Sequence, residues 1–201
     1  MMNLVSGKKH IIFVIGAAIV LGFVTFLLWT FLNPKTHTTV DMAYAPNIET
    51  LTQSASIVVK GTVLDETEST NLRRDSENPN KADDDHITPG TYHTVNIEEV
   101  MSGNMDIKNI ENIKVAVTGG SYKDVQAKPE ANLEPDHTYV FFLNETAQGK
   151  PYFFGAGEPY IFEIEDSQIH AVSNLDYEDI FEDDHMSLDT LHDKIKQSTN
   201  D

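Results

Sequence analysis

The sequence contains no cysteine, so neither a disulfide bond nor a thioether-linked lipid is available to the protein. An exported domain of this composition has to be held together by its own hydrophobic core. Positions 1–33 contain no aspartate or glutamate, although the chain carries 32 acidic residues. The only tryptophan, Trp29, lies in that acid-free segment. These absences separate an acid-free N-terminal segment from an acidic remainder that has no tryptophan for its core.

Signatures of catalysis are also missing. The GGSYK sequence at 119–123 lacks the second glycine of a nucleophile elbow. No H-E-x-x-H pattern and no EF-hand loop occurs. The histidines His93, His137 and His170 lie in or beside predicted strands, where a partly exposed structural histidine is the simpler interpretation. We therefore expect that the protein is not an enzyme, and an extracellular hydrolase is the least favoured class.

A long apolar run is present at residues 11–32, which are 22 residues without a charged side chain. As a helix this run spans about 33 Å, enough to cross a hydrocarbon core of about 30 Å. Lys8 and Lys9 precede it, which favours a cytoplasmic N-terminus. We predict a cytoplasmic tail over 1–10 and a single transmembrane helix over 11–33 in the cell membrane, with the C-terminal domain extracytoplasmic.

A cleaved secretory signal is the alternative interpretation of this segment. Signal peptides have an apolar run of about 7 to 15 residues, followed by a cleavage site of small residues. The run here is longer, and the Ala-Tyr-Ala sequence at 43–45 follows it only at a distance and is itself followed by Pro46. The pattern favours a retained signal anchor.

The chain beyond the predicted anchor is strongly acidic. It holds all 32 acidic residues against 12 of the 14 basic ones, a formal charge of −20. Nucleic acids and anionic lipid surfaces need a positive protein surface, so this charge argues against both as partners. The charge fits cations, basic polymers or basic protein partners, and solubility alone is the simpler explanation. The partner classes that remain are a surface protein, a peptide or a wall polymer.

After the anchor the pattern is that of a spacer followed by a β domain. Residues 34–54 hold two prolines and many small polar residues, which predict a juxtamembrane spacer ending in one short helix. A polar interval at 65–90 predicts a mobile surface loop. A last helix is predicted to begin at the N-cap Ser187. Alternation and β-branched residues predict strands at 57–64, 91–101, 113–117, 138–143, 152–154, 159–165 and 169–172.

These elements predict a mainly β fold over residues 55–201, which include an acidic tail and the terminal helix. We expect a small OB-like Greek-key β-barrel with a C-terminal helix, preceded by the one transmembrane helix. Few strands and uneven loops favour this barrel over an immunoglobulin-like sandwich, which has more regular strand spacing and often a core tryptophan.

Strands and turns follow one another in a characteristic order in six segments: IVVKGTV, YHTVNIEEVMSGN, IKVAVTGGSY, LEPDHTYVFFL, YFFGAGEPYIFEIEDSQIH and SLDTLHDKI. In this order they resemble a family of uncharacterised exported domains from Gram-positive bacteria, over residues 48–196. The opening strand is similar to that of netrin-like barrels. The resemblance implies an OB-like barrel on a bacterial surface, and it implies no active-site residue.

Aromatic residues are concentrated in the second half of this domain. Most are expected in the core, since phenylalanine and tyrosine dominate small β cores. Tyr152 and Phe154 stand beside Gly155 and Gly157, which permit close backbone approach. These four residues are the candidates for a ligand-facing patch that stacks on a sugar or docks a peptide.

Two acidic clusters, each ending in a histidine, are candidate metal ligands. Carboxylate oxygens suit Ca²⁺ and imidazole suits transition metals. Neither cluster has the spacing of a defined site, and a solvated acidic loop is the simpler interpretation. The residues are Asp84, Asp85 and His86 in the first cluster and Asp183, Asp184 and His185 in the second.

The expected function is that of a single-pass, membrane-anchored extracytoplasmic binding or interaction module without catalytic activity and without a cofactor. A Ca²⁺-dependent surface domain is the alternative. Thermal stabilisation by millimolar Ca²⁺ distinguishes the two, because a cation that binds only the folded state raises its stability.

Overall fold

A computed structural model describes residues 44–103, 110–173 and 185–199 of the chain. The predicted cytoplasmic tail, the predicted anchor and residues 34–43 of the predicted spacer lie outside these ranges. Within them, no helix is both long enough and apolar enough to cross a membrane. The elements in chain order are α2 (Ile48–Ser54), β1 (Ile57–Asn71), β2 (Pro89–Gly103), β3 (Asn112–Thr118), β4 (Gly120–Tyr122), β5 (Val125–Ala127), β6 (Thr138–Glu145), β7 (Tyr152–Gly155), β8 (Ile161–Glu165), β9 (Gln168–Ala171), β10 (His185–Ser187) and α3 (Leu188–Ser198).

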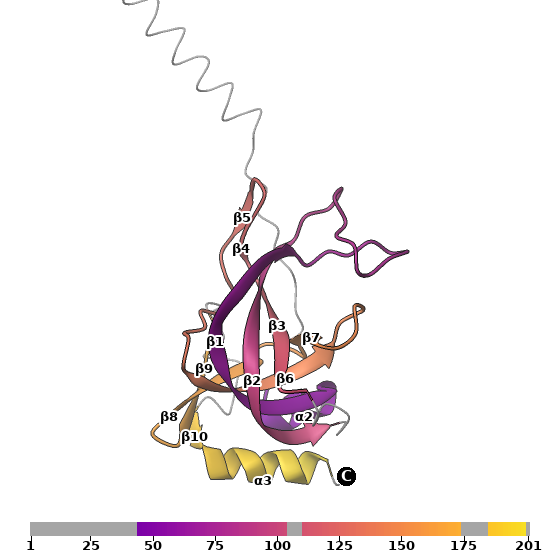
Figure 1. Cartoon of the computed structure of the whole chain (residues 1–201). Coiled ribbons are helices and arrows are strands. Elements are labelled where there is room, and N and C mark those ends of the chain that lie inside the picture. Colours follow the sequence, from indigo (N-terminus) through magenta and orange to yellow (C-terminus); the bar gives the residue numbers. More distant parts are fainter. Residues whose placement is uncertain (1–43, 104–109, 174–184, 200–201) are drawn as a thin grey trace, which may run out of the picture. The chain divides into compact units, whose positions relative to one another are not determined.

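Eight strands form one sheet in the order β1-β2-β3-β7-β6-β8-β9-β10, and β1 also pairs with β6 (Figure 1). Strands β1, β2, β3, β7 and β6 are therefore each hydrogen-bonded to two others of the same five. In this set β3 and β7 run parallel and the other pairs antiparallel. The predicted mainly β class with a C-terminal helix is confirmed.

Strand β6 lies at the centre of the hydrophobic core. It pairs with β1, β7 and β8, and residues 139–143 are each at most 1% exposed. A strand covered on both faces needs apolar side chains at successive positions rather than at alternate ones. The sequence TYVFFL has that character and predicts this strand correctly.

The first strand is longer than its apolar pattern predicts. We expected it to end at residue 64, but β1 continues to Asn71, and residues 67–71 pair with residues 89–93 of β2. Most side chains in this half are exposed, so hydrophobic periodicity does not reveal a strand that backbone hydrogen bonds hold in place. The predicted loop is shortened to residues 72–88, which we call the 72–88 loop.

Helix α2 belongs to the folded domain and not to a spacer. Asn47 caps it, with Oδ1 accepting a hydrogen bond from the Thr50 N–H at 2.9 Å. Ile48 and Leu51 are fully buried in the same core cluster as β1 and β6. The predicted boundary at residue 55 is therefore too late, because a short polar helix contributes two core side chains.

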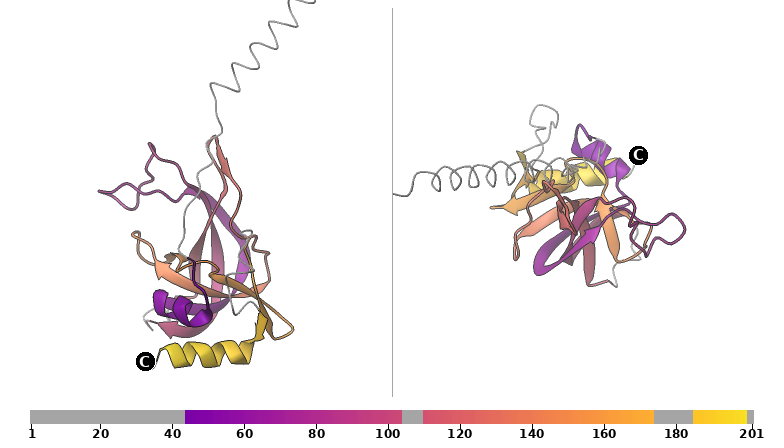
Figure 2. Two further views of the ribbon diagram at one scale, coloured as in Figure 1. Left: turned by 180° about the vertical axis from the view of Figure 1, so that it is seen from behind. Right: turned by 90° about the horizontal axis from the view of Figure 1, so that it is seen from above.

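Helix α3 begins as the sequence predicts. The hydroxyl of Ser187 accepts a hydrogen bond from the Thr190 N–H at 3.2 Å, and Leu191 and Ile195 are buried. Helices α2 and α3 contact each other at one end of the domain. The β4–β5 hairpin and the 72–88 loop project from the opposite end (Figures 1 and 2).

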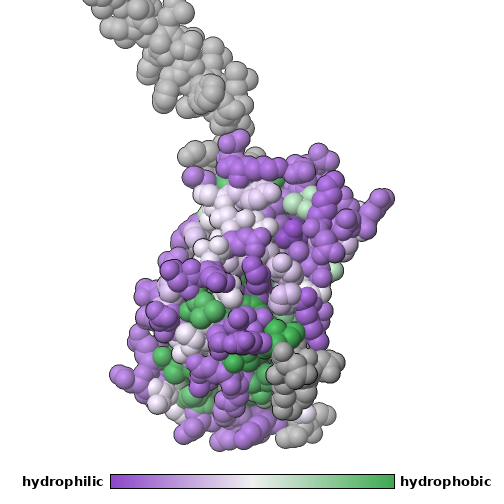
Figure 3. All heavy atoms as spheres, in the orientation of Figure 1, coloured by the Kyte–Doolittle hydropathy of each residue, from purple (hydrophilic) through white to green (hydrophobic). Residues whose placement is uncertain are grey.

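The surface of the domain matches its composition. The face seen in Figure 3 is mostly hydrophilic, with hydrophobic side chains gathered in its lower half. Among the described residues, only Tyr44 and Phe154 are large hydrophobic residues classed as exposed, at 48% and 42%.

Candidate functional site

A pocket of about 640 Å³ lies beside the 72–88 loop. Its walls come from that loop, from β2 and β3, and from two parts of the segment 146–160. The volume is in the range of small-molecule sites, which is roughly 300–1,000 Å³. This pocket is the candidate functional site.

Three of the four predicted ligand-facing residues line this pocket. They are Phe154, whose ring is partly exposed, and Gly155 and Gly157, which are buried. Tyr152 does not line it, and its ring packs against Tyr92 with the ring centroids 5.1 Å apart. That these residues face a ligand remains a prediction, whereas their position at a pocket is observed for three of them.

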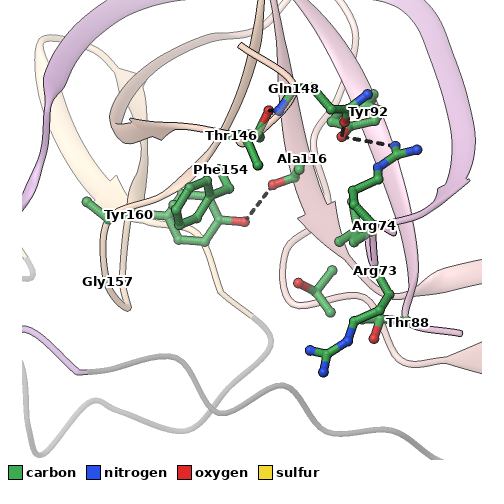
Figure 4. Close-up of a pocket in the computed structure, with 15 residues that line it drawn as sticks. Arg73, Arg74, Thr88, Tyr92, Ala116, Thr146, Gln148, Phe154, Gly157 and Tyr160 are labelled. Carbon is green, nitrogen blue, oxygen red and sulfur yellow. Dashed lines mark hydrogen bonds between the residues drawn. The ribbon is translucent and has the colours of Figure 1, made fainter. Parts of the chain in front are cut away.

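Tyr160 forms part of the wall next to Phe154. Its ring is buried, and its hydroxyl donates a hydrogen bond to the Ala116 carbonyl at 3.3 Å (Figure 4). Gly155 makes room for this ring, because a Cβ at that position would stand 2.5 Å from two ring carbons of Tyr160. The close approach that the sequence predicts at Gly155 is thus a packing contact with the Tyr160 ring.

Substituting Gly155→Ala should lower the free energy of unfolding by about 1–3 kcal/mol, because the added methyl group overlaps the Tyr160 ring. Denaturant unfolding of the full chain measures this loss. In a Tyr160→Ala background the same substitution should cost clearly less, since the ring carbons that the added Cβ would meet are gone. An equal cost in both backgrounds would show that the ring is not the reason.

Arg73 and Arg74 stand across the pocket from Phe154 and Tyr160 (Figure 4). They are the only arginines in the sequence. The Arg74 guanidinium donates to the Thr70 hydroxyl at 3.2 Å, and its buried Nε has no hydrogen-bond partner among the residues that the structure describes. Within the described ranges neither guanidinium forms an ion pair with a carboxylate.

Tyr92 connects the two loops that border the pocket. Its hydroxyl donates to Gln148 Oε1 at 2.7 Å and accepts a hydrogen bond from Arg74 at 3.4 Å. Gln148 lies in residues 146–151, between β6 and β7, which we call the 146–151 loop. The tyrosine ring itself is 3% exposed. A single buried hydroxyl therefore holds one polar group from each loop.

Asn71 fixes both ends of the 72–88 loop. Its Nδ2 donates to the carbonyls of Asp83 at 2.6 Å and His86 at 3.0 Å. Its Oδ1 accepts from the N–H groups of Arg73 at 3.0 Å and Thr88 at 2.8 Å. The side chain is fully buried, and Arg73 and Thr88 both line the pocket. No periodicity in the sequence reveals this role.

Two buried glutamates lie in the electrostatic surroundings of Tyr160. Glu158 is 2% exposed, and burial, with added repulsion from Glu130, raises its pKa to about 8. Burial also raises the pKa of Glu130, against a hydrogen bond from Thr118 that lowers it. One carboxyl oxygen of each glutamate has no hydrogen-bond partner among the described residues. Glu158 therefore keeps its proton at neutral pH, unlike the solvated carboxylates that dominate the chain.

The first predicted metal cluster is engaged in other contacts. Asp84 forms an ion pair with Lys123 at 2.6 Å. His86 Nδ1 lies 3.0 Å from a carboxyl oxygen of Asp83, whose other oxygen accepts from the Asp85 N–H. These contacts account for the carboxylates of Asp83 and Asp84 without a metal ion.

The second predicted metal cluster falls at a boundary of the described residues. Asp183 and Asp184 lie outside them, and His185 is described only as the backbone of the first residue of β10. Across the described ranges no group of three or more histidine, aspartate or glutamate side chains is placed to hold a metal ion.

The strand histidines lie on two parts of the sheet. His137 Nδ1 and Glu163 form a hydrogen bond, which raises the pKa of the imidazole, and His170 is the register partner of Glu163. His93 lies on β2, where burial lowers its pKa. None of the three lines the pocket.

No protein-family model matches the sequence, and no curated protein matches it either. The pocket and the side chains that line it are therefore the basis for inferring a function.

Proposed function

We propose that the chain is a single-pass membrane protein that presents an extracytoplasmic binding module without catalytic activity. Its anchor is the apolar run at 11–32, preceded by Lys8 and Lys9, and its exported part carries a formal charge of −20. The resemblance to exported domains of Gram-positive bacteria belongs to this proposal. The ligand is taken in the pocket between the 72–88 loop and the 146–151 loop.

The strand pairing supports an OB-like Greek-key barrel as the fold of the module. Strands β1, β2, β3, β7 and β6 pair in a cycle, with β1 bonded to both β2 and β6. A five-stranded Greek-key barrel that is partly open is the architecture of OB folds. In this count β6 is the fourth barrel strand and β7 the fifth.

The position of the pocket is the observation that carries the proposal. OB folds bind their ligands on the second and third strands and in the loops that join strands one to two and four to five. The 72–88 loop and the 146–151 loop are these two connections here, and both line the pocket together with β2 and β3. The position of the pocket supports binding by analogy with the fold, and the side chains that line the pocket give independent support.

The lining supports binding rather than hydrolysis. The described residues that form the pocket offer arginine, threonine, glutamine and aromatic side chains, and none of them is Ser, Cys, His, Asp or Glu. A hydrolase needs a nucleophile or a general base at the reacting atom. The threonine and tyrosine hydroxyls of the described lining have no imidazole or carboxylate beside them in the pocket to activate them. A wall polymer, a peptide or a surface protein is the ligand class that we propose.

Phe154→Ala should weaken binding of the full chain, purified in detergent, to isolated Gram-positive cell walls by several-fold to about tenfold. The exposed ring of Phe154 is the contact that this change removes. Tyr44→Ala is the matched control, because Tyr44 is the other exposed large aromatic and lies outside the pocket. Co-sedimentation measures both. Equal losses for the two variants, or none for either, would contradict a ligand site in this pocket.

A further inference from the structure

The two arginines of the pocket are unusual in their surroundings. The chain has 32 acidic residues, and ion pairs form at Lys60, Lys114 and Lys123, yet among the described residues Arg73 and Arg74 pair with no carboxylate. Arginine presents a planar fork of donors that matches a carboxylate or a phosphate. Both guanidinium groups line one pocket and pair with no carboxylate among the described residues, so their donors can bind an anionic group of a ligand.

Building on the proposed function, we propose that the ligand is a saccharide bearing a carboxylate or phosphate group, and that Arg73 and Arg74 bind this anionic group. The net negative charge of the domain does not prevent such binding. Charges farther away than about 8 Å are largely screened at physiological salt. The guanidinium groups in direct contact with the ligand therefore decide which charge the pocket accepts.

The rest of the lining suits the sugar part of such a ligand. The exposed ring of Phe154 offers a flat apolar face on the wall opposite the arginines (Figure 4). Thr88, Thr146 and Gln148 add hydroxyl and amide groups that exchange hydrogen bonds with sugar hydroxyls. An apolar surface with a few convergent polar groups is the usual composition of a small-ligand site.

The backbone around the pocket does not offer an edge to an extended peptide. Peptides that bind by strand addition need free backbone groups on a sheet edge. Beside the pocket, the carbonyl of Ala116 accepts from the Tyr160 hydroxyl at 3.3 Å, and that of Thr118 accepts from the Glu130 N–H at 2.9 Å. These acceptors on β3 are already used, which favours a saccharide over a peptide strand.

The backbone of Arg73 and the guanidinium of Arg74 are held in advance of binding. Asn71 fixes the backbone of Arg73, and the hydroxyls of Thr70 and Tyr92 hold the guanidinium of Arg74. Side chains that are ordered before the ligand arrives lose less entropy on binding.

The test is calorimetric titration of the full chain in detergent with matched oligosaccharides. One pair is a galacturonic acid oligomer and its methyl ester, and the other is a maltose oligomer with and without a phosphate ester. At least one charged oligomer should bind about 10- to 100-fold more tightly than its neutral counterpart. Arg73→Gln and Arg74→Gln should each remove most of this advantage. The oligomer pair in which the charged member binds more tightly shows whether the anionic group is a carboxylate or a phosphate.

Lys81→Gln is the matched control, because it removes one positive charge from the same loop outside the pocket lining. It should leave the advantage of the charged oligomer unchanged. Melting temperatures of all variants identify any that fail to fold. Arg73→Lys, at an exposed position, keeps the positive charge but removes the planar guanidinium, and so tests whether the shape of that group matters.

Three results would overturn the inference. Equal binding of charged and neutral oligomers that is lost in Phe154→Ala would show that the pocket binds a ligand without regard to its charge. A glutamate hexapeptide that binds through the arginines while the saccharides do not would assign a different ligand class. If none of the oligomers binds, the ligand is not an anionic saccharide. Co-sedimentation of Phe154→Ala and Tyr44→Ala with cell walls would then still test whether the pocket is a binding site.

Discussion

Raising the pH from about 5 to about 9 should lower the free energy of unfolding by roughly 3–5 kcal/mol through Glu158 alone. The carboxyl is 2% exposed, and burial raises its pKa from the ordinary 4.5 to about 8. Between these two values the folded chain keeps a proton that the unfolded chain releases. The folded state is therefore stabilised fully below about pH 4.5, and this contribution is lost as the pH rises through about 8.

Denaturant unfolding of the full chain over this pH range measures the effect, with Glu158→Gln as the comparison. The variant keeps the shape of the protonated carboxyl but cannot ionise, so its stability should change much less with pH. Glu130 contributes in the same direction, because burial raises its pKa as well. His93 acts in the opposite direction, but only below its ordinary pKa of about 6.5. Equal slopes for the two proteins above neutral pH would rule out Glu158 as the cause.

Asn71→Ala should lower the free energy of unfolding by about 2–5 kcal/mol, since it removes four part-buried hydrogen bonds that this buried side chain makes to the backbone. The loss should be local as well as global. Limited trypsin digestion of the variant should cut faster after Arg73, Arg74 or Lys81, the basic residues of the 72–88 loop.

Asn80→Ala is the control for this change, because Asn80 lies in the same loop but is exposed. It should alter stability by no more than about 0.5 kcal/mol. If Asn71→Ala resembled it in both denaturant midpoint and cleavage rate, the side chain of Asn71 would not be what holds the loop.

The predictable parts of the fold are those that a local pattern encodes. The apolar run of β6 and the N-cap Ser187 announce a central strand and a terminal helix, and both are present. The second half of β1 is different, because its side chains are mostly exposed and its stability comes from pairing with a strand distant in sequence. Helix α2 is not recognisable from the sequence as part of the domain, because two apolar residues in a polar stretch do not reveal that they are buried in the core.

The sequence predicts the residues of only one wall of the candidate pocket. Phe154, Gly155 and Gly157 stand out in the sequence because aromatics next to glycines suggest an accessible ring. Arg73 and Arg74 are the only arginines in an acidic chain, and this feature of the sequence indicates a special role for them. The roles of Asn71 and Tyr92 depend on contacts between distant segments, and no motif encodes them.

The first acidic cluster makes contacts that its sequence does not reveal. Asp84, Asp85 and His86 look like ligands when they are read as neighbours in the sequence. In the fold Asp84 turns to Lys123 of the β4–β5 hairpin, and His86 turns to Asp83. Adjacent carboxylates in a loop need not point at one place, so their spacing alone does not predict a shared ion.

The anchoring of the 72–88 loop by Asn71 separates the tip of that loop from its two ends. Lengthening a closed surface segment costs little, about 0.6 kcal/mol for each doubling. Residues 76–80, most of which are exposed, can therefore accept an inserted peptide or a fluorophore while Arg73 and Thr88 stay in place. A dye at that position would report on occupancy of the pocket from just outside it, without occupying the pocket itself.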